Sequence, residues 1–248
     1  MRIYGVDVGG SGVKGAPVDL AKGDLAAKRK RIPTPKPATP AAVLDAIGAV
    51  VTHHGWNGPV GVTIPGVVRH GVVETAANID EEWIGFPAED ALSHYLGMPV
   101  TVLNDADAAG LAEARYGAAQ GVDGVVILLT FGTGIGSAYL HDGHLVPNTE
   151  LGHLIFNGQK AEHYAAGRLV KRGDLEIDWW AKRVDELLTY LEGLFWPDMF
   201  VMGGGISKRF ETFSHLLTTR ARVVPAVLRN QAGIVGAAYA AAIGANHA

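Results

Sequence analysis

Two glycine-rich stretches of this 248-residue chain have the residue types of phosphate-binding loops. Each of them, Asp7–Gly15 and Leu128–Ser137, runs from an apolar strand pattern through glycines into another extended segment. Backbone amides in such turns bind anions, and nearby hydroxyl and ammonium groups add to the binding. The residues expected to face the anion are Gly9, Gly10, Ser11, Gly12 and Lys14 in the first stretch, and Thr130, Gly132, Thr133 and Gly134 in the second.

The first stretch also carries Asp7 at the end of its strand, where a carboxylate can hold a hydrated magnesium ion. Its glycines match the Gly-x-Gly-x-x-Gly spacing of a dinucleotide fingerprint. That fingerprint must open a helix, whereas Gly15 leads into another extended segment, which argues against a dinucleotide-binding oxidoreductase. A glycine hairpin without a ligand is the remaining alternative. Two stretches of the same construction favour hairpins that grip a phosphate chain from both sides.

The string Asn104-Asp105-Ala106-Asp107 follows an apolar strand pattern and precedes a helical one. A carboxylate at this junction can accept the proton of a sugar hydroxyl that attacks phosphorus. Asp105 is therefore the candidate general base, and the alternative is that Asp105 only caps the helix. Asp107 is expected to be a capping or structural carboxylate.

A third group of polar residues lies further along the chain, where Glu150 and His153 are followed by Glu162. Acceptor groups at this spacing can meet adjacent hydroxyls of a sugar ring. The alternative for His153 is a purely structural role. After the next apolar strand come Gly203, Gly204 and Gly205, which can lie flat under a nucleobase or a phosphate tail, or form an ordinary strand-to-helix loop in which Ser207 caps the helix.

The elements that must position these residues alternate between strands and helices. The first part of the chain predicts strands over residues 1–8, 13–20, 25–32, 60–63 and 100–103, with helices over 40–53 and 88–96, the first capped by Thr39. The second part predicts helices over 106–116, 163–195 and 233–243, strands over 125–131 and 199–202, and a hairpin about Asp142-Gly143. This order indicates an α/β protein.

The composition of the chain excludes several classes of protein. Without cysteine the chain has no disulfide and no thiolate metal site, which fits a cytoplasmic location. A net charge of −4 argues against general nucleic-acid binding, and no segment has the length of a membrane span or the pattern of a signal peptide. The one dense charge block, Lys28–Arg31, is expected to be a solvated strand edge, with contact to a polyanion as the alternative.

The strings DVGGSGVKG, PGVV, TAANID, NDADAAGLAE, LTFGTGIGSA, PNTELGH and GGGIS resemble those of the ROK sugar kinases, in the actin and hexokinase superfamily. Within that family they are similar to the polyphosphate-dependent glucokinases. The resemblance implies a two-lobed actin-like (ribonuclease H-like) α/β fold with a cleft between the lobes. Residues 1–106 and the helix at about 234–245 would form the small lobe, and residues 107–233 the large lobe.

The resemblance also implies an activity, the transfer of a phosphoryl group from polyphosphate, and from ATP, to the 6-hydroxyl of glucose with Mg²⁺. Asp105 would be the catalytic base and Asp7 would hold Mg²⁺ through water, while Gly203, Gly204 and Gly205 would line the donor site. The sugar hydroxyls would contact Asn78, Asn104, Asp105, Glu150, His153 and Glu162. A basic track for polyphosphate would use Lys14, Lys160, Arg168, Lys171 and Arg172.

One departure from the family pattern concerns metal binding. Many ROK proteins hold zinc with a histidine like His153 and three cysteines, whereas Asn157–Ala166 retains Glu162 but has no cysteine, so no zinc is expected. The resemblance further implies a homodimer, for which the apolar stretch Glu186–Trp196 is a candidate interface or, alternatively, core. A kinase for mannose, fructose or an N-acetyl sugar, and a non-catalytic sugar sensor, remain as alternatives.

Overall fold

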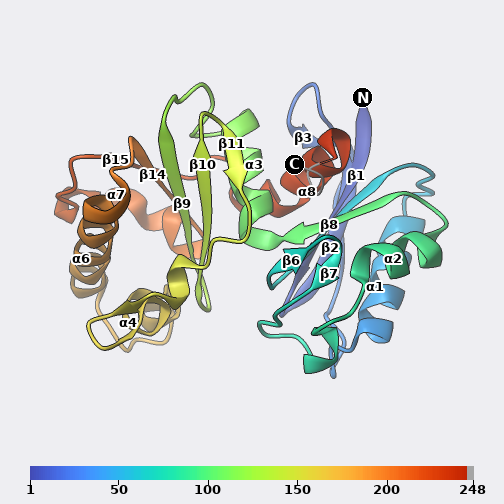
Figure 1. Cartoon of the computed structure of the whole chain (residues 1–248), viewed down its shortest axis with the longest axis horizontal. Coiled ribbons are helices and arrows are strands. Elements are labelled where there is room, and N and C mark those ends of the chain that lie inside the picture. Colours follow the sequence, from blue (N-terminus) through green and yellow to red (C-terminus); the bar gives the residue numbers. More distant parts are fainter. Residues whose placement is uncertain (245–248) are drawn as a thin grey trace. The chain divides into compact units, whose positions relative to one another are not determined.

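The computed structural model describes residues 1–244, which fold into two compact units (Figure 1). The first unit comprises Met1–Ala112 and the returning C-terminal segment from Gln231, and the second comprises Glu113–Asn230. The change from one unit to the next falls within helix α3 (Asp105–Tyr116), further along the chain than the boundary expected after residue 106. Residue 245 of the expected C-terminal helix lies outside the described residues.

A six-stranded mixed sheet forms the centre of the first unit. Its strand order is β3-β2-β1-β5-β8, and β4 also pairs with β2. Strand β1 is antiparallel to β2 and parallel to β5, which in turn is parallel to β8. The strands are β1 (Arg2–Gly9), β2 (Gly12–Asp19), β3 (Asp24–Leu25), β4 (Lys30–Ile32), β5 (Val60–Ile64) and β8 (Val100–Asn104).

The single strand expected over residues 25–32 is wrong, because β3 and β4 are separate pieces. Both strands pair with β2. Strand β3 pairs at Val18 and Asp19, and β4 pairs at Val13 to Gly15. Pro17 lies between these two places and has no N–H to give to a ladder. Only its carbonyl is used, by the amide of Ala26 at 2.8 Å. The chain bends there before it rejoins β2.

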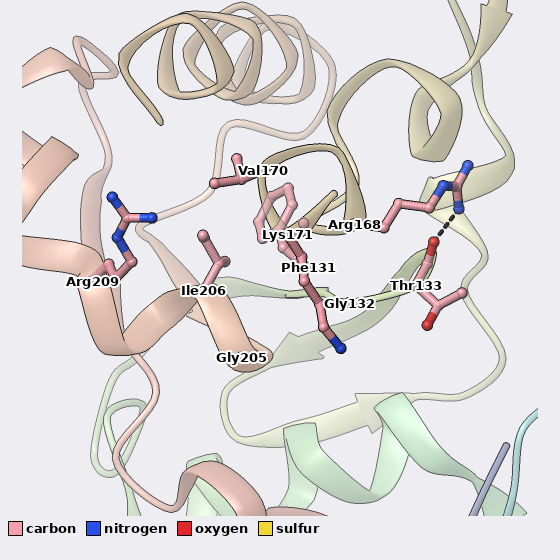
Figure 2. A pocket seen from close by; sticks show the side chains of 10 residues that line it. Phe131, Gly132, Thr133, Arg168, Val170, Lys171, Gly205, Ile206 and Arg209 are labelled. Carbon is pink, nitrogen blue, oxygen red and sulfur yellow. Dashed lines mark hydrogen bonds between the residues drawn. The ribbon is translucent and has the colours of Figure 1, made fainter. Parts of the chain in front are cut away.

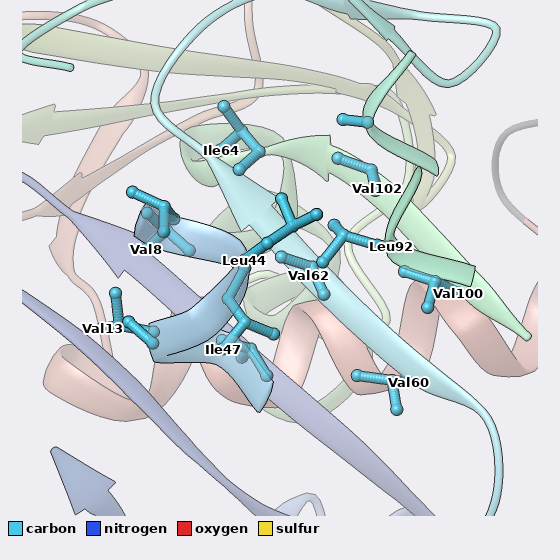
Figure 3. Packing of buried hydrophobic residues seen from close by; sticks show 14 of the residues in the cluster. Val8, Val13, Leu44, Ile47, Val60, Val62, Ile64, Leu92, Val100 and Val102 are labelled. Carbon is cyan, nitrogen blue, oxygen red and sulfur yellow. The ribbon is translucent and has the colours of Figure 1, made fainter. Parts of the chain in front are cut away.

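Helices α1 (Pro40–Thr52) and α2 (Ala88–Leu96) cover one face of this sheet. Thr39 caps α1 as expected, since its hydroxyl accepts a hydrogen bond from the amide of Ala42. Figure 3 shows the apolar cluster that they bury, with Leu44 and Ile47 of α1 and Leu92 of α2 against the valines of the strands. The short strands β6 (Val68–Arg69) and β7 (Val72–Val73) form a hairpin that the sequence pattern did not predict.

Helix α8 (Ala232–Ile243) packs directly on the backbone of β1 and β5 (Figure 1). A Cβ on Gly5 would lie 1.9 Å from the carbonyl oxygen of Ile234, and one on Gly61 would lie 1.8 Å from that of Ala237. Residues two apart on a strand share a face. Asp7 and Thr63 therefore point to the same face as these glycines, on the side of α8.

The second unit has a five-stranded sheet of order β11-β10-β9-β14-β15. Strands β9, β14 and β15 are parallel, and β9, β10 and β11 form antiparallel pairs. Asp142 and Gly143, with φ of 51° and 76°, form the expected turn between β10 and β11. The strands are β9 (Val125–Phe131), β10 (Ile135–His141), β11 (His144–Val146), β14 (Met199–Gly203) and β15 (Arg222–Pro225), with a separate hairpin of β12 (Ile155–Phe156) and β13 (Gln159–Lys160).

The continuous helix expected over residues 163–195 is wrong. The chain instead forms α4 (Ala161–Ala165), α5 (Arg168–Lys171) and α6 (Ile177–Phe195). Gly167 breaks the pattern because its backbone packs on β9, where a Cβ would lie 2.6 Å from the carbonyl oxygen of Phe131. Gly173 breaks it again with a φ of 79°. Buried residues of α6, among them Trp180 and Leu187, then pack on the sheet.

Several shorter helices complete the fold. They are α7 (Phe210–Phe213) and the 3₁₀ segments Glu81–Trp83, Leu151–His153, Gly205–Arg209, Ser214–Leu216 and Arg229–Gln231. Within residues 1–244, no helix is both long and apolar enough to cross a membrane.

The packing of α8 makes a testable distinction between two helical glycines. A Cβ on Gly236 would lie 1.7 Å from the carbonyl oxygen of Ala108, whereas a Cβ on Gly193 of α6 would meet nothing within 4 Å. Gly236→Ala should therefore lower the free energy of unfolding by about 2 kcal/mol or more. Gly193→Ala should raise it by about 0.5–1 kcal/mol, the helix propensity difference. Urea denaturation of both variants measures this, and equal effects would contradict the packing.

Candidate active site

The first glycine-rich stretch forms the hairpin between β1 and β2. Gly9 and Gly12 are paired across the strands, so Gly10 and Ser11 form the turn. Because the next element is a strand that begins at Gly12, the helix that a dinucleotide fingerprint requires is missing here. None of the glycines in this stretch has a positive φ. Gly12 and Gly15 are instead crowded by neighbouring side chains, so these two glycines provide space.

Asp7 lies in a row of polar side chains that crosses the first sheet. Its Oδ2 is 3.2 Å from Nζ of Lys14 on β2, and its Oδ1 accepts a hydrogen bond of 3.4 Å from the hydroxyl of Thr63 on β5. The Asp7 and Lys14 side chains are 20% and 24% exposed, so both are accessible to a ligand. The carboxyl ends of the parallel strands β1, β5 and β8 meet at this edge, where α/β sheets usually bind ligands.

A magnesium ion fits Asp7 as a partly exposed single carboxylate. Mg²⁺ keeps several waters and is usually bound through one or two carboxylates and the phosphates of the substrate. No group of three or more histidine, aspartate and glutamate side chains in the described part of the chain is arranged to hold a metal ion. Asp7 therefore has the chemistry to hold hydrated Mg²⁺ together with a bound phosphate.

Asn78 lies beside the first glycine turn. A Cβ on Gly10 would lie 3.3 Å from the Cβ of Asn78, which itself has a φ of 62°. The hydroxyl of Thr34 donates to the carbonyl of Gly9. The loop that carries Asn78 and the segment that carries Thr34 thus both border the turn. Asn78, a predicted sugar contact, therefore lies next to Gly10, a predicted phosphate contact.

Asn104, at the end of β8, caps helix α3. Its Oδ1 accepts hydrogen bonds from the amides of Ala106 at 2.7 Å and Asp107 at 3.1 Å, and its Nδ2 donates to the carbonyl of Gly66 at 3.0 Å. Asp105 is the first residue of α3 and is partly exposed. The capping role that was the alternative for Asp105 is therefore carried by Asn104, and Asp107, 2% exposed, is a buried carboxylate.

The second glycine-rich stretch borders a pocket of about 470 Å³ in the second unit (Figure 2). The pocket combines three apolar side chains with three basic ones and has no acidic residue in its lining. Its walls come from the end of β9, from α5 and from the segment after β14. The lining residues are Phe131, Gly132, Thr133, Gly167, Arg168, Val170, Lys171, Gly205, Ile206 and Arg209.

The glycines of this pocket are of two kinds. Gly204 has a φ of 82°, and a Cβ there would lie 2.5 Å from the carbonyl oxygen of Phe131, so the fold requires this glycine. Gly132 and Gly205 have no positive φ, and a Cβ on either would meet nothing within 4 Å. The fold itself therefore leaves open space at Gly132 and Gly205. Space over exposed backbone is what a phosphate or a flat ring needs to approach closely.

Arg168 braces the second glycine loop. Its amide donates to the carbonyl of Gly132 at 2.9 Å, and its guanidinium donates to the carbonyl of Thr133 (Figure 2). Of the basic residues proposed for a polyphosphate track, Arg168 and Lys171 line the pocket, whereas Lys160 and Arg172 do not. Arg209 lines it as well and was missed, because its position in a 3₁₀ segment after the glycines has no pattern of its own.

The hydroxyls of Ser207 and Thr130 donate to backbone carbonyls of this loop region. The hydroxyl of Ser207 donates to the carbonyl of Gly204 at 2.8 Å, so the expectation that Ser207 caps a helix is wrong. The hydroxyl of Thr130 donates to the carbonyl of Gly136 at 3.5 Å, across the strand pair that flanks the loop. Both hydroxyls stabilise the loop backbone.

Glu150, His153 and Glu162 lie together in the second unit. Nδ1 of His153 is 3.8 Å from Oε2 of Glu150, and its Nε2 is 4.0 Å from Oε1 of Glu162. Oε2 of Glu162 lies beside the second glycine loop, because a Cβ on Gly134 would be 2.4 Å from it. Burial raises the pKa of Glu150 and Glu162 adds to the rise, while His153 and Lys160 oppose it. The cluster offers hydrogen-bond acceptors to a polyhydroxylated ligand.

The two α/β units each contain a strand-turn-strand hairpin of glycines at the carboxyl ends of parallel strands. Together with the carboxylate at the start of α3, they define the class of the protein, an actin-like α/β kinase fold of the type found in sugar kinases.

Comparison with known proteins identifies the family. The ROK family model matches residues 3–169, and the polyphosphate glucokinase of Mycobacterium tuberculosis (strain CDC 1551 / Oshkosh) is 54% identical over 98% of this chain and 92% of that protein. The glucokinase of Streptomyces coelicolor is 29% identical over 94% of this chain and 95% of its own length. This chain belongs to the ROK family.

Solved structures agree with this assignment. The inorganic polyphosphate/ATP-glucomannokinase of Arthrobacter sp. strain KM superposes with a TM-score of 0.93 at 49% identity, over 98% of this chain and 99% of that one. A ROK family glucokinase from Streptomyces griseus, in complex with glucose and AMPPNP, has a TM-score of 0.82 at 28% identity, over 98% and 100% of the two chains.

The raised pKa of Glu150 predicts a pH-dependent gain in stability on its removal. A carboxyl whose pKa is higher in the folded than in the unfolded chain costs stability when it is ionised. This cost is present above the folded pKa and disappears as the pH falls to the unfolded value. Glu150→Gln should therefore be more stable than the original protein at neutral pH, and the difference should vanish in acid. Urea midpoints from pH 4 to 8 measure it.

The matched control is Glu211→Gln, which removes an exposed carboxylate from the same unit. Its effect on the urea midpoint should be small and should not follow the pH dependence of Glu150→Gln. A stability difference between Glu150→Gln and the original protein that is smaller at neutral pH than in acid would contradict the assigned direction.

Proposed function

We propose that this protein is a glucokinase that transfers a phosphoryl group from inorganic polyphosphate, and also from ATP, to the 6-hydroxyl of glucose. The observation that carries the proposal is the junction of β8 and α3, where Asn104 caps the helix and Asp105 is its partly exposed first residue. The glycine hairpins of both units support it, and so do the names of the relatives that the chain resembles over nearly its full length.

In this proposal Asp105 accepts the proton of the 6-hydroxyl as its oxygen attacks the terminal phosphorus of the donor. Phosphoryl transfer passes through a loose transition state, so the protein contributes mainly position and charge neutralisation. The remaining hydroxyls of glucose are bound by Asn78, Asn104, Glu150, His153 and Glu162. The proximity of Asn78 to Gly10, and of Glu162 to Gly134, supports the placement of sugar groups next to each glycine loop.

The donor phosphates are bound by the amides of Gly9–Gly12 and of Gly132–Gly134, with Lys14 and Thr133 beside them. Asp7 holds hydrated Mg²⁺, which when bound neutralises charge on the donor phosphates. The open backbone at Gly132 and Gly205 and the basic residues of the pocket support a donor site that extends along α5. No zinc is part of this proposal, and a homodimer and a cytoplasmic location remain predictions.

Mannose is a second candidate acceptor. The support for it is the glucomannokinase of Arthrobacter, which is 49% identical to this chain. Glucose and mannose differ only in the configuration of one hydroxyl. A coupled assay of both sugars, each with ATP and with polyphosphate, measures the preference directly.

Replacement of the proposed base gives the sharpest test of the reaction. Asp105→Asn should lower kcat by at least about a hundredfold, because the amide cannot accept the proton. Glucose binding, measured by calorimetry, should be retained, and an unchanged unfolding midpoint shows that α3 is intact. Turnover close to that of the original protein would remove Asp105 from this role.

Two adjacent cations at the end of α5, Lys171 and Arg172, test the donor site. Lys171 lines the pocket and Arg172 does not, so Lys171→Met and Arg172→Met form a pair with equal loss of charge. Lys171→Met should raise the KM for polyphosphate by about threefold to tenfold and reduce its dependence on salt, since a screened phosphate contact is lost. Arg172→Met should change neither by more than about twofold.

The original protein provides the reference for that experiment. Its KM for polyphosphate should rise more steeply with salt than its KM for ATP, because a long polyanion makes more charge contacts. The same salt dependence for both donors, or equal effects of Lys171→Met and Arg172→Met, would contradict a basic track in this pocket.

A further inference from the structure

Arg31 belongs to the charge block that was expected to form a solvated strand edge, but it lies against the first glycine hairpin. Arg31 of β4 is paired with Lys14 of β2, and Lys14 is paired with Asp7 of β1. Directly opposite residues on neighbouring antiparallel strands point to the same face of a sheet. Asp7, Lys14 and Arg31 therefore form a row of one acid and two bases that crosses three strands.

The Arg31 side chain leans along the sheet to the turn itself. Its Nη2 donates to the carbonyl of Ser11 at 2.6 Å. A Cβ on Gly12 would lie 2.7 Å from Nε of Arg31, so the guanidinium occupies the room that a side chain at Gly12 would take. Gly12 is thus needed for the approach of Arg31 to the turn, although its φ is ordinary.

No carboxylate among the described residues neutralises the charge of Arg31. Lys14 forms an ion pair with Asp7, whereas within residues 1–244 Arg31 forms none with a carboxylate. A guanidinium has five N–H donors in a rigid fork, and the bond to Ser11 uses one of them. The fork of Arg31 is exposed and matches the geometry of phosphate oxygens.

The second unit contains the same arrangement. There the guanidinium of Arg168 donates to the carbonyl of Thr133, the hydroxyl residue of the second glycine loop, and Arg168 lines the pocket. In each hairpin an arginine from a different segment therefore holds the carbonyl of the residue between two glycines. A solvated strand edge does not account for this repetition.

We propose that Arg31 is a phosphate-binding residue of the first glycine hairpin, and that it contacts the phosphates of the donor that are not transferred. The inference rests on the proposed function for the identity of the donor. The bond to Ser11 fixes the guanidinium beside the turn amides, and its remaining N–H groups bind non-bridging oxygens. Both polyphosphate and ATP have such phosphates, so Arg31 acts on both donors.

Lys30 supplies a matched control for this proposal. It is the neighbour of Arg31 in β4, but it is paired with Gly15 and so points to the opposite face. Arg31→Gln and Lys30→Gln remove the same charge from the same strand. The long-range electrostatic potential changes by a similar amount in both variants, whereas only Arg31→Gln removes the proposed contact with phosphate.

The experiment measures binding of inorganic tripolyphosphate by calorimetry, and steady-state kinetics with polyphosphate and with ATP. Arg31→Gln should weaken tripolyphosphate binding by about tenfold, the scale of one charge-assisted contact. It should raise the KM for both donors while the KM for glucose stays within about twofold. Lys30→Gln should change none of these by more than about twofold, and Arg31→Lys should lie between Arg31→Gln and the original protein.

Three outcomes would overturn the inference. Equal tripolyphosphate affinity in Arg31→Gln and Lys30→Gln would do so. A lower kcat with unchanged donor KM would do so as well, since it would assign Arg31 to positioning the turn. If Arg31→Gln fails to fold, Arg31→Lys replaces it in the test, and an unchanged donor KM and tripolyphosphate affinity in Arg31→Lys would overturn the inference. An original protein that phosphorylates no glucose would refute the proposed function, while the tripolyphosphate comparison would still test Arg31.

Discussion

The absence of Cβ atoms at a set of backbone contacts is the constraint on which this structure depends. Helix α8 approaches the first sheet so closely that Gly5 and Gly61 lie against carbonyl oxygens of the helix. The helix is equally close to Asp7, because a Cβ on Gly233 would lie 3.1 Å from the carboxyl carbon of Asp7. The face of the sheet that carries Asp7 is therefore defined by how closely the helix packs on its glycines.

The same principle separates structural glycines from those available to a ligand. Glycine allows a close approach of backbone to another group as well as a positive φ. At Gly167 and at Gly204, the carbonyl group of Phe131 occupies the space that a side chain would need. Gly132 and Gly205 have ordinary backbone angles and open space. Among the glycines that line the pocket, these two therefore leave room over the backbone for a phosphate or a flat ring.

Local patterns predicted the elements well where each element buries one continuous apolar pattern. Helix α2 and strand β9 have the bounds expected from their periodicity. The interruption of the expected 163–195 helix was missed, because Gly167 is required by a contact with Phe131 that is distant in sequence. The split of β3 from β4 depends on Pro17 in the strand opposite, which periodicity within one segment does not register.

The candidate site residues were proposed from the sequence for a different reason, since their types and order resemble the ROK family pattern. What the pattern did not contain is the support around them. Glu113, fully buried, accepts hydrogen bonds from the amides of Ala118, Val227 and Leu228 and so joins the end of α3 to a distant loop. A carboxylate within an alanine-rich helix gives no signal of Val227 and Leu228 as partners, because these two residues lie more than a hundred positions away.

The two arginines beside the glycine hairpins show how charge and backbone act together in this fold. A turn that presents amides to an anion directs carbonyls elsewhere, and those carbonyls need donors. Arg31 and Arg168 each supply one donor to a carbonyl, and each guanidinium still has N–H groups and a full positive charge. One side chain thus both stabilises the turn and adds to its positive potential. Lysine, with a compact ammonium group, does this less well than the planar fork of arginine. Two hairpins built in this way concentrate positive charge beside the amides of their turns.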